Sequence, residues 1–223
     1  MSRRRVLLLR HGETDWNADG RWQGQGGAGL SRLGRRQAAD TAAFLAATRP
    51  DIASVVRSDL ERVAETTGPV LERLAVPVEV DRRWREIDVG TWSGRTHEEV
   101  RALDPAGYQT WRTGGDPRRG GGETDADLRV RVAAALEDLV GGSGTVLVVT
   151  HGGPVRHAVA EALRLPAGGH RRLAGAGNCS LSELRVEAGQ WSLVGYNERG
   201  HLAADCAWER NEGHASTARP SSE

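Results

Sequence analysis

The segment Leu7–Asn17 holds the residues whose types and spacing most plainly permit chemistry. The apolar run Val6–Leu9 predicts a buried strand, and Arg10 and His11 follow it directly. A histidine at the carboxyl end of a central strand lies where open α/β sheets bind their ligands. The neutral imidazole of His11 can act as a nucleophile toward phosphorus. The guanidinium of Arg10 can hold an oxyanion. This segment therefore indicates phosphoryl chemistry on a histidine.

A second predicted strand, Thr145–Val149, also leads to a histidine, His151. A glycine follows each of the two histidines, Gly12 after His11 and Gly152 after His151. Glycine lets the backbone turn sharply and leaves N–H groups free to point at an anion. If the two strands are neighbours in a parallel sheet, both histidines face one pocket. The prediction of one shared pocket therefore depends on the two strands being neighbours, which the sequence alone does not show.

The composition excludes several other kinds of chemistry. All 30 basic residues are arginine, so a lysine Schiff base, a pyridoxal phosphate linkage and a P-loop are ruled out. The formal net charge is zero, which does not favour nucleic acid or an anionic membrane as a partner. The two cysteines, Cys179 and Cys206, lack metal-like or redox-like spacing, so we expect a cytoplasmic protein. The run Val6–Leu9 is too short for a signal peptide or a membrane span.

The chain alternates strand-like and helix-like segments, which predicts a single α/β domain with a mostly parallel central sheet and helices on both faces. Ser31 is expected to cap a helix that runs to about Ala47. Asp59 is expected to cap another helix that reaches about Leu74, with a kink or break at Gly68-Pro69. The further strands and helices are predicted at Ala53–Val56, Val78–Val80, Glu98–Leu103, Ala106–Trp111 and Thr124–Leu139.

The carboxyl-terminal third predicts a hairpin, Ser180–Val186 with Trp191–Tyr196, whose exposed edge could pair two chains into a homodimer. Beyond residue 200 the composition turns polar, so we expect a domain over residues 1–199 and a partly disordered polar tail over 200–223. The loop Thr113–Gly122 is predicted to be mobile. Its arginines, among them Arg119, either bind a second anionic group of the substrate or are solvated.

Five motifs occur in a fixed order along most of the chain. They are Arg10–Thr14 with Asn17, Ser58–Arg62, Arg85–Gly94, Gly121–Glu123 and His151–Gly153. In this order the chain resembles the histidine phosphatase superfamily, in the branch that contains cofactor-dependent phosphoglycerate mutases and their small phosphatase relatives. The resemblance covers about residues 5–197 and implies a phosphoglycerate mutase-like α/β fold. Five ordered motifs are far more specific than a lone Arg-His-Gly.

The resemblance implies catalytic roles for five residues. His11 becomes the phosphohistidine, while Arg10, Arg62 and His151 bind the phosphoryl oxygens. Glu86 protonates the leaving alcohol and then activates water. Two arginines and a histidine supply the charge stabilisation that phosphoryl transfer needs. We therefore expect neither a metal nor a cofactor.

Four further residues are expected to bind substrate: Asn17, Gln23, Gly24 and Gly152. Asn17 either donates to the phosphoryl group or serves as a turn residue. The segments Arg21–Gln25 and Gly175–Asn178 resemble glucosyl-3-phosphoglycerate phosphatases within the family.

Two other residues have alternative interpretations. Glu123 either caps the following helix or orients an arginine. His157 lies six residues after His151, the wrong spacing for one helix face, and acidic residues do not cluster near the pair, so a metal site is not expected.

The sequence thus predicts a metal-independent phosphatase for a small phosphorylated metabolite. The substrate is expected to be a phosphoglycerate or sugar-phosphate derivative such as glucosyl-3-phosphoglycerate. Only 64 residues separate Glu86 from His151, where mutases of this branch carry a long insertion, and the more open pocket favours water as the acceptor. The alternatives are a mutase-type phosphotransferase and a non-catalytic phosphate-binding protein, although a binding protein has little need of an acid such as Glu86.

Overall fold

The structure, a computed structural model, describes residues 3–141 and 143–204. Six strands form one sheet in the order β3-β2-β4-β1-β5-β6. Strand β4 lies between β1 and β2 and is parallel to both, and β3 is parallel to β2. On the other side of the sheet, β5 is antiparallel to β1, and β6 is antiparallel to β5. The strands are β1 (Arg3–Arg10), β2 (Ile52–Arg57), β3 (Val78–Val80), β4 (Gly144–Thr150), β5 (Leu181–Glu187) and β6 (Gln190–Glu198). The predicted mostly parallel sheet and the predicted carboxyl-terminal hairpin are confirmed.

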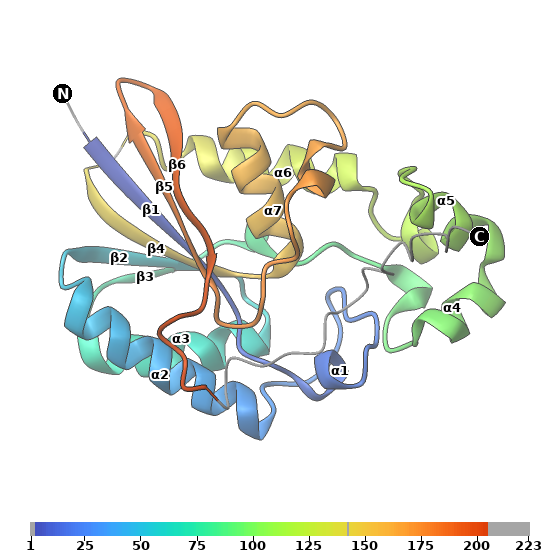
Figure 1. Cartoon of the computed structure of the whole chain (residues 1–223), viewed down its shortest axis with the longest axis horizontal. Coiled ribbons are helices and arrows are strands. Elements are labelled where there is room, and N and C mark those ends of the chain that lie inside the picture. Colours follow the sequence, from blue (N-terminus) through green and yellow to red (C-terminus); the bar gives the residue numbers. More distant parts are fainter. Residues whose placement is uncertain (1–2, 142, 205–223) are drawn as a thin grey trace, which may run out of the picture.

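Helices cover both faces of this sheet, as predicted (Figure 1). Helices α6 and α7 pack on one face and α2 and α3 on the other, while the short helices α4 and α5 form a lobe beside the sheet. The helices are α1 (Asp15–Ala18), α2 (Arg32–Thr48), α3 (Glu61–Leu74), α4 (His97–Leu103), α5 (Pro105–Arg112), α6 (Asp125–Glu137) and α7 (Gly152–Ala162). Four 3-10 turns complete the described elements: η1 (Arg82–Trp84), η2 (Gly90–Trp92), η3 (Arg119–Gly121) and η4 (Gly169–Arg172). Within the described residues, no helix is long and apolar enough to cross a bilayer.

The apolar run of β1 is buried on both sides because successive side chains point to opposite faces. Val6 and Leu8 join the core beneath α6 and α7. Leu7 and Leu9 join the core beneath α2 and α3. All four are at most 2% exposed. This double burial fixes the register of β1 and therefore the place where Arg10 and His11 leave the sheet.

The lobe of α4 and α5 is held by an aromatic cluster around Trp22. The ring of Trp22 lies 4.8 Å from that of Trp111 and 5.1 Å from that of Trp92, between centroids. His97 and Tyr108 complete the cluster. Such ring pairs add to the apolar area that they bury. The cluster connects the lobe to the loop that follows α1.

The predicted N-cap of α3 is wrong, and so is the predicted break at Gly68-Pro69, whereas a kink there stays a prediction. Asp59 does not cap the helix; the N-cap is Leu60, which makes no side-chain cap bond. The Asp59 carboxylate instead accepts from Arg85 Nε at 2.6 Å and from Arg82 Nε at 3.1 Å, and these charged partners replace the cap. The helix also continues through Pro69 to Leu74. Its buried apolar face packs on the sheet before and after the proline, which offsets the lost backbone bond.

Candidate active site

The two motif histidines lie together at one edge of the sheet. Strands β1 and β4 pair in parallel with Arg10 opposite Thr150. The next residue on each strand is therefore a histidine, and the ring centroids of His11 and His151 are 5.1 Å apart. Both rings are buried, with 3% and 0% exposure. The adjacency on which the sequence prediction depended is confirmed.

His11 is held in one tautomer by the backbone. Its Nδ1 lies 2.7 Å from the carbonyl oxygen of Gly12, so Nδ1 carries the proton and Nε2 keeps its lone pair. Burial and the charges of Arg62 and Arg10 hold the pKa of His11 well below its ordinary value. The imidazole is therefore neutral near pH 7, as a nucleophile must be. Gly12 is required here because a Cβ would lie 2.5 Å from the carbonyl oxygen of Gly34.

His151 is held in the opposite tautomer by side chains. Arg62 Nε donates to His151 Nδ1 at 3.2 Å, so the ring proton lies on Nε2. That Nε2 donates to Ser58 Oγ at 3.1 Å. Burial, the charge of Arg62 and the proximity of His11 hold the pKa of His151 well below its ordinary value. The second histidine is thus a neutral hydrogen-bonding group.

Arg62 lies on the first turn of α3 and is only 2% exposed. Its Nη1 donates to Gly26 O at 2.8 Å and its Nη2 to Gly24 O at 2.6 Å. Burial lowers the pKa of Arg62 to about 10, so the side chain is still cationic near pH 7. The loop after α1 therefore fixes the direction of this charge.

Arg10 is buried at the end of β1, directly before His11. Its Nη1 donates to Ala176 O at 2.7 Å. A Cβ at Gly152 would lie 3.7 Å from Arg10 Cδ, so the guanidinium runs along the first turn of α7. Arg10 and Arg62 both contribute to the lowered pKa of His11, which places two positive charges around one imidazole.

The Glu86 carboxylate lies against the first turn of α7. Its Oε1 accepts from the backbone N–H of Ile87 at 2.8 Å, and its Oε2 accepts from that of Gly153 at 3.1 Å. A Cβ at Gly153 would overlap Glu86 Oε1, so glycine there admits the carboxylate. Glu86 also raises the pKa of Arg62, which places it within the same electrostatic cluster. All five predicted catalytic residues are thus gathered at this edge.

The predicted substrate-binding residues surround this cluster in different ways. Asn17 completes a capping box with Thr14 at α1, which is the turn role that the sequence allowed. Its Nδ2 also lies 3.4 Å from Gln23 Oε1. Gly24 presents its carbonyl to Arg62, as described above, and has a positive φ of 55°. Gly152 begins α7 and brings the amino end of that helix to the cluster, a favourable place for an anion.

Two functional neighbours were not singled out from the sequence. Asn178 is 1% exposed, and its Nδ2 donates to His11 O at 3.0 Å and to Asn17 Oδ1 at 3.3 Å. Thr66 Oγ1 accepts from Gly12 N at 3.0 Å and donates to Arg62 O at 2.7 Å. Asn178 belongs to the segment Gly175–Asn178, which resembles glucosyl-3-phosphoglycerate phosphatases. Thr66 carries no sequence signal apart from its place one helical turn after Arg62.

One buried group offers potential metal ligands. Asp125, His157 and His170 each place a ligand atom within 4.8 Å of the others. In the sequence, acidic residues do not cluster near His157, yet in the fold Asp125 Oδ1 lies 3.5 Å from its Nε2. Both carboxylate oxygens are already bound, Oδ1 by Arg119 Nη2 at 2.8 Å and Oδ2 by Arg171 Nη2 at 3.1 Å. Two guanidinium groups at this carboxylate oppose a further cation, so the donor set favours an ion network over a metal site.

The sequence predicted that Arg119 either binds a substrate anion or is solvated. The structure shows neither role. Arg119 is 6% exposed and paired inside the domain.

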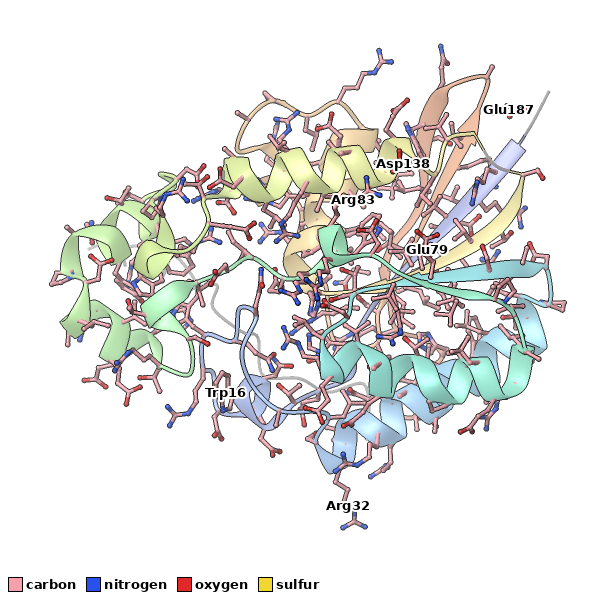
Figure 2. The ribbon with its side chains drawn as sticks, turned by 180° about the vertical axis from the view of Figure 1, so that it is seen from behind. Trp16, Arg32, Glu79, Arg83, Asp138 and Glu187 are labelled. Atoms are coloured by element: carbon pink, nitrogen blue, oxygen red, sulfur yellow. The ribbon has the colours of Figure 1, made fainter. Side chains whose placement is uncertain are left out.

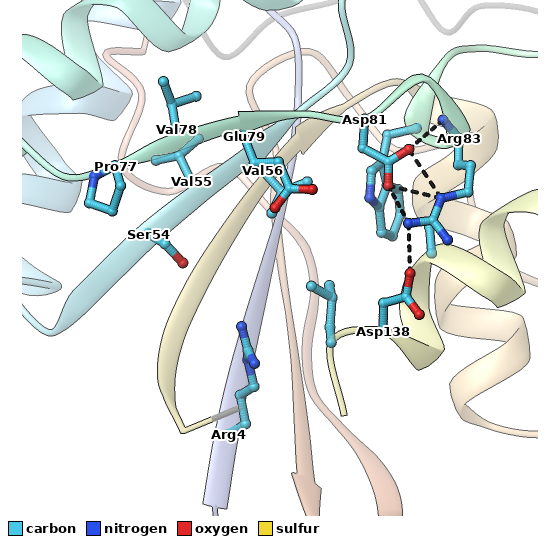
Figure 3. Close-up of a pocket in the computed structure, with 13 residues that line it drawn as sticks. Arg4, Ser54, Val55, Val56, Pro77, Val78, Glu79, Asp81, Arg83 and Asp138 are labelled. Carbon is cyan, nitrogen blue, oxygen red and sulfur yellow. Dashed lines mark hydrogen bonds and ion pairs between the residues drawn. The ribbon is translucent and has the colours of Figure 1, made fainter. Parts of the chain in front are cut away.

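A cavity of about 300 Å³ lies between the sheet and the carboxyl end of α6 (Figure 3). It is lined by Arg4, near the start of β1, and by Val56 and Asp138 among others. Arg83 closes one side through ion pairs to Asp81 at 2.8 Å and to Asp138 at 2.7 Å, and Figure 2 shows Arg83 beside Asp138 from behind. Arg4 lies six residues before Arg10 on one strand, a separation of roughly 20 Å. This cavity is distinct from the histidine cluster.

The cluster combines two cations, two neutral imidazoles and one carboxyl group. Guanidinium groups bind tetrahedral oxyanions through fixed N–H donors. A lone pair on His11 Nε2 faces the same region as a carboxyl group that can move a proton. The arrangement can therefore bind a phosphoryl group, accept it on nitrogen and protonate what leaves.

Comparison with known proteins gives consistent matches. A model of the histidine phosphatase superfamily (branch 1) matches residues 6–199. The glucosyl-3-phosphoglycerate phosphatase of Mycobacterium tuberculosis (strain CDC 1551 / Oshkosh) is 36% identical over an alignment of 223 positions, which covers 92% of this chain and 99% of the relative. The enzyme of that name from Mycolicibacterium vanbaalenii is 38% identical over 190 residues, 81% of this chain and 84% of the relative. A solved mycobacterial glucosyl-3-phosphoglycerate phosphatase in complex with VO3 superposes with a TM-score of 0.80 at 34% identity, covering 88% of this chain and 100% of that one.

Proposed function

Because the chain belongs to branch 1 of the histidine phosphatase superfamily, we propose that its phosphatase activity proceeds through a phosphohistidine on His11. The observation that carries this proposal is the state of His11: a buried, neutral imidazole with its proton on Nδ1 and two arginines close by. A neutral Nε2 can attack phosphorus, and the guanidiniums stabilise the charge on the equatorial oxygens. Arg10, Arg62 and His151 bind the transferring group.

In the first step, His11 Nε2 forms a bond to phosphorus as the bond from phosphorus to the alcohol oxygen breaks. Glu86 gives its proton to the departing oxygen, which leaves as an alcohol. The backbone N–H of Gly153 and the N–H of Ile87 hold the carboxylate that remains. The phosphoryl charge stays between the two arginines.

In the second step, water attacks the phosphorus and Glu86 takes up its proton. The bond between His11 Nε2 and phosphorus breaks, and the imidazole returns to its starting tautomer because Gly12 O still accepts from Nδ1. The products are inorganic phosphate and a regenerated carboxylic acid at Glu86. The cycle uses one water and no external co-reactant.

The substrate that we favour is glucosyl-3-phosphoglycerate. Two similar proteins bear that activity in their names and align over most of this chain. The loops that resemble these phosphatases, Arg21–Gln25 and Gly175–Asn178, are also the loops that contact Arg62 and Arg10. A substrate of this class carries a carboxylate and a sugar next to the phosphate, so it gives the loops more to bind than phosphate alone.

The test is phosphate release in EDTA from a panel of p-nitrophenyl phosphate, 3-phosphoglycerate, glucosyl-3-phosphoglycerate and sugar phosphates. We expect turnover of the glucosyl ester above the others and its loss in His11→Asn. His170→Asn is the matched control, because the ring of His170 lies against Asp125 and His157 and makes no described contact with the five proposed catalytic residues. Equal turnover in His11→Asn would contradict the nucleophile. A higher kcat/KM for another ester would contradict the substrate and leave the mechanism standing.

The cytoplasmic location and the homodimer stay predictions of the sequence. The strand that would pair two chains, β6, lies at the edge of the sheet, and within the described residues no further strand pairs with its outer side. Sedimentation of the purified chain would test the dimer. The polar tail over 200–223 lies mostly outside the described residues, which end at 204.

A further inference from the structure

Glu86 lies in a segment, residues 85–89, that belongs to no helix or strand. Side chains from elsewhere hold its backbone. Arg131, on α6, reaches three carbonyl oxygens: those of Arg83 at 2.7 Å, Arg85 at 2.6 Å and Glu86 at 2.9 Å. One guanidinium thus does for this segment what a ladder of backbone hydrogen bonds does for a strand.

The direction of Arg131 is fixed by Glu123. Arg131 Nε donates to Glu123 Oε1 at 2.9 Å, and Arg131 Nη2 donates to Glu123 Oε2 at 2.8 Å. Glu123 also accepts from Asp88 N at 2.9 Å. It does not cap α6, because Thr124 forms the capping box there with Asp127. The alternative that the sequence allowed, a glutamate that orients an arginine, is confirmed.

These contacts use every donor that Arg131 has. A guanidinium offers five N–H groups in a rigid fork, and five acceptors are present: three carbonyl oxygens and the two oxygens of Glu123. The pair is largely buried, with side-chain exposures of 17% for Arg131 and 23% for Glu123. Neither lysine, with three donors on one atom, nor glutamine can repeat this pattern.

From this geometry we infer that Arg131, oriented by Glu123, is a positioning residue for the Glu86 carboxyl group. The inference rests on the proposed function, because it needs Glu86 to be the proton donor. The pair fixes the backbone on both sides of Glu86, from Arg83 to Asp88. Its loss shifts the carboxyl group relative to the leaving oxygen, and a shift of about 1 Å can cost about 100-fold in rate.

The experiment uses the leaving group as its readout. An alkyl phosphate such as 3-phosphoglycerate needs a proton donor when its alcohol departs, whereas p-nitrophenyl phosphate releases a stable phenolate without one. The quantity to compare is kcat/KM, which reports the steps up to alcohol release. In Arg131→Gln we expect kcat/KM for the alkyl ester to fall about 100-fold and that for the aryl ester to fall less than about threefold.

Two controls separate positioning from stability. Arg129→Gln removes another arginine of α6, which donates to Glu161 Oε2 at 2.9 Å and to Leu165 O at 3.2 Å and makes no contact with the Glu86 segment among those described. We expect it to leave the ratio of the two kcat/KM values unchanged. Arg131→Lys keeps the charge and not the fork, so its ratio should stay close to that of Arg131→Gln.

A double-mutant cycle with Glu86→Gln completes the test. If Arg131 acts through Glu86, adding Arg131→Gln to Glu86→Gln changes the alkyl kcat/KM by less than about threefold, because the proton donor is already gone. Equal losses for both esters in Arg131→Gln, or a full additional loss in the double variant, would overturn the inference and leave the proposed function intact. An unchanged alkyl kcat/KM in Glu86→Gln would overturn the proposed role of Glu86 and the inference with it.

Discussion

Asp125→Asn is the substitution for which the structure gives the clearest energetic expectation. The carboxylate lies between Arg119 and Arg171, and its Arg119 partner is 7% exposed. Each pair of unit charges about 4 Å apart interacts by about 4 kcal/mol at an effective dielectric constant of about 20, before desolvation is subtracted. Removal of the shared anion leaves two guanidiniums facing each other. Breaking a buried pair in this way costs about 3–5 kcal/mol, so the free energy of unfolding should fall by about that amount.

The assay is urea unfolding at several pH values. The contacts with Arg119 and the two histidines hold the pKa of Asp125 well below its usual range. A depressed carboxyl pKa contributes stability that is complete above the pKa of the unfolded chain, about 4, and is lost as the pH falls further. The difference between wild type and Asp125→Asn should therefore be present at pH 7 and at pH 5 and should shrink below about pH 4.

Asp127→Asn is the matched control, two residues along α6. Its ion pair with Arg118 is at 3.1 Å, but the side chains are 58% and 43% exposed for Arg118 and Asp127. Exposed pairs contribute about 0–1 kcal/mol, and the asparagine oxygen can still accept from Thr124 N in the capping box, so this variant should lose no more than about 1 kcal/mol. If Asp125→Asn lost as little as Asp127→Asn at pH 7, the interpretation of the Asp125 group as a buried ion network would be wrong.

Three further predictions concern the histidine cluster. His11 should remain a neutral Nδ1–H tautomer at pH 5.5 in ¹⁵N NMR spectra, where a histidine of ordinary pKa is about nine-tenths protonated; a titration midpoint near 6.5 would contradict the lowered pKa. Gly12→Ala should lower the free energy of unfolding by about 1–3 kcal/mol, because the new Cβ meets Gly34 O, and a wild-type thermal midpoint would contradict this. Ser58→Ala should lower the free energy of unfolding by about 1–3 kcal/mol, because it leaves the buried His151 Nε2–H without its acceptor, and an unchanged urea midpoint would refute that hydrogen bond.

Local patterns predicted the elements well because the determinants are local. The apolar run Val6–Leu9 gave the core of β1, and Ser31 accepts from Gly34 N as an N-cap should. The failures in α3 have a non-local cause. Asp59 has the right chemistry for a cap, but Arg85 binds it from a segment that lies 26 residues away. Pro69 has the right chemistry to break the helix, but α3 continues past it with its apolar face packed on the sheet.

The site divides in the same way. Residue types at two strand ends predicted Arg10, His11 and His151, and the family resemblance added Arg62 and Glu86. The pairing of β1 with β4 brings the first three together. No sequence signal marks Arg131, because its function depends on reaching carbonyl oxygens 45 to 48 residues earlier in the chain. Arg119 is a similar case, because the composition of its loop predicts exposure, whereas its ion-pair partner Asp125 is buried. Backbone acceptors and buried counter-charges become visible only when the fold is known.

The most direct test of the proposed mechanism is the capture of the covalent intermediate. The enzyme would be mixed rapidly with ³²P-labelled substrate in EDTA, quenched in alkali and digested. We expect label on the peptide that contains His11, stable to alkali, labile to acid and absent from His11→Asn. Rapid turnover with no protein-bound label at any quench time, or label on a different residue, would contradict nucleophilic attack by His11.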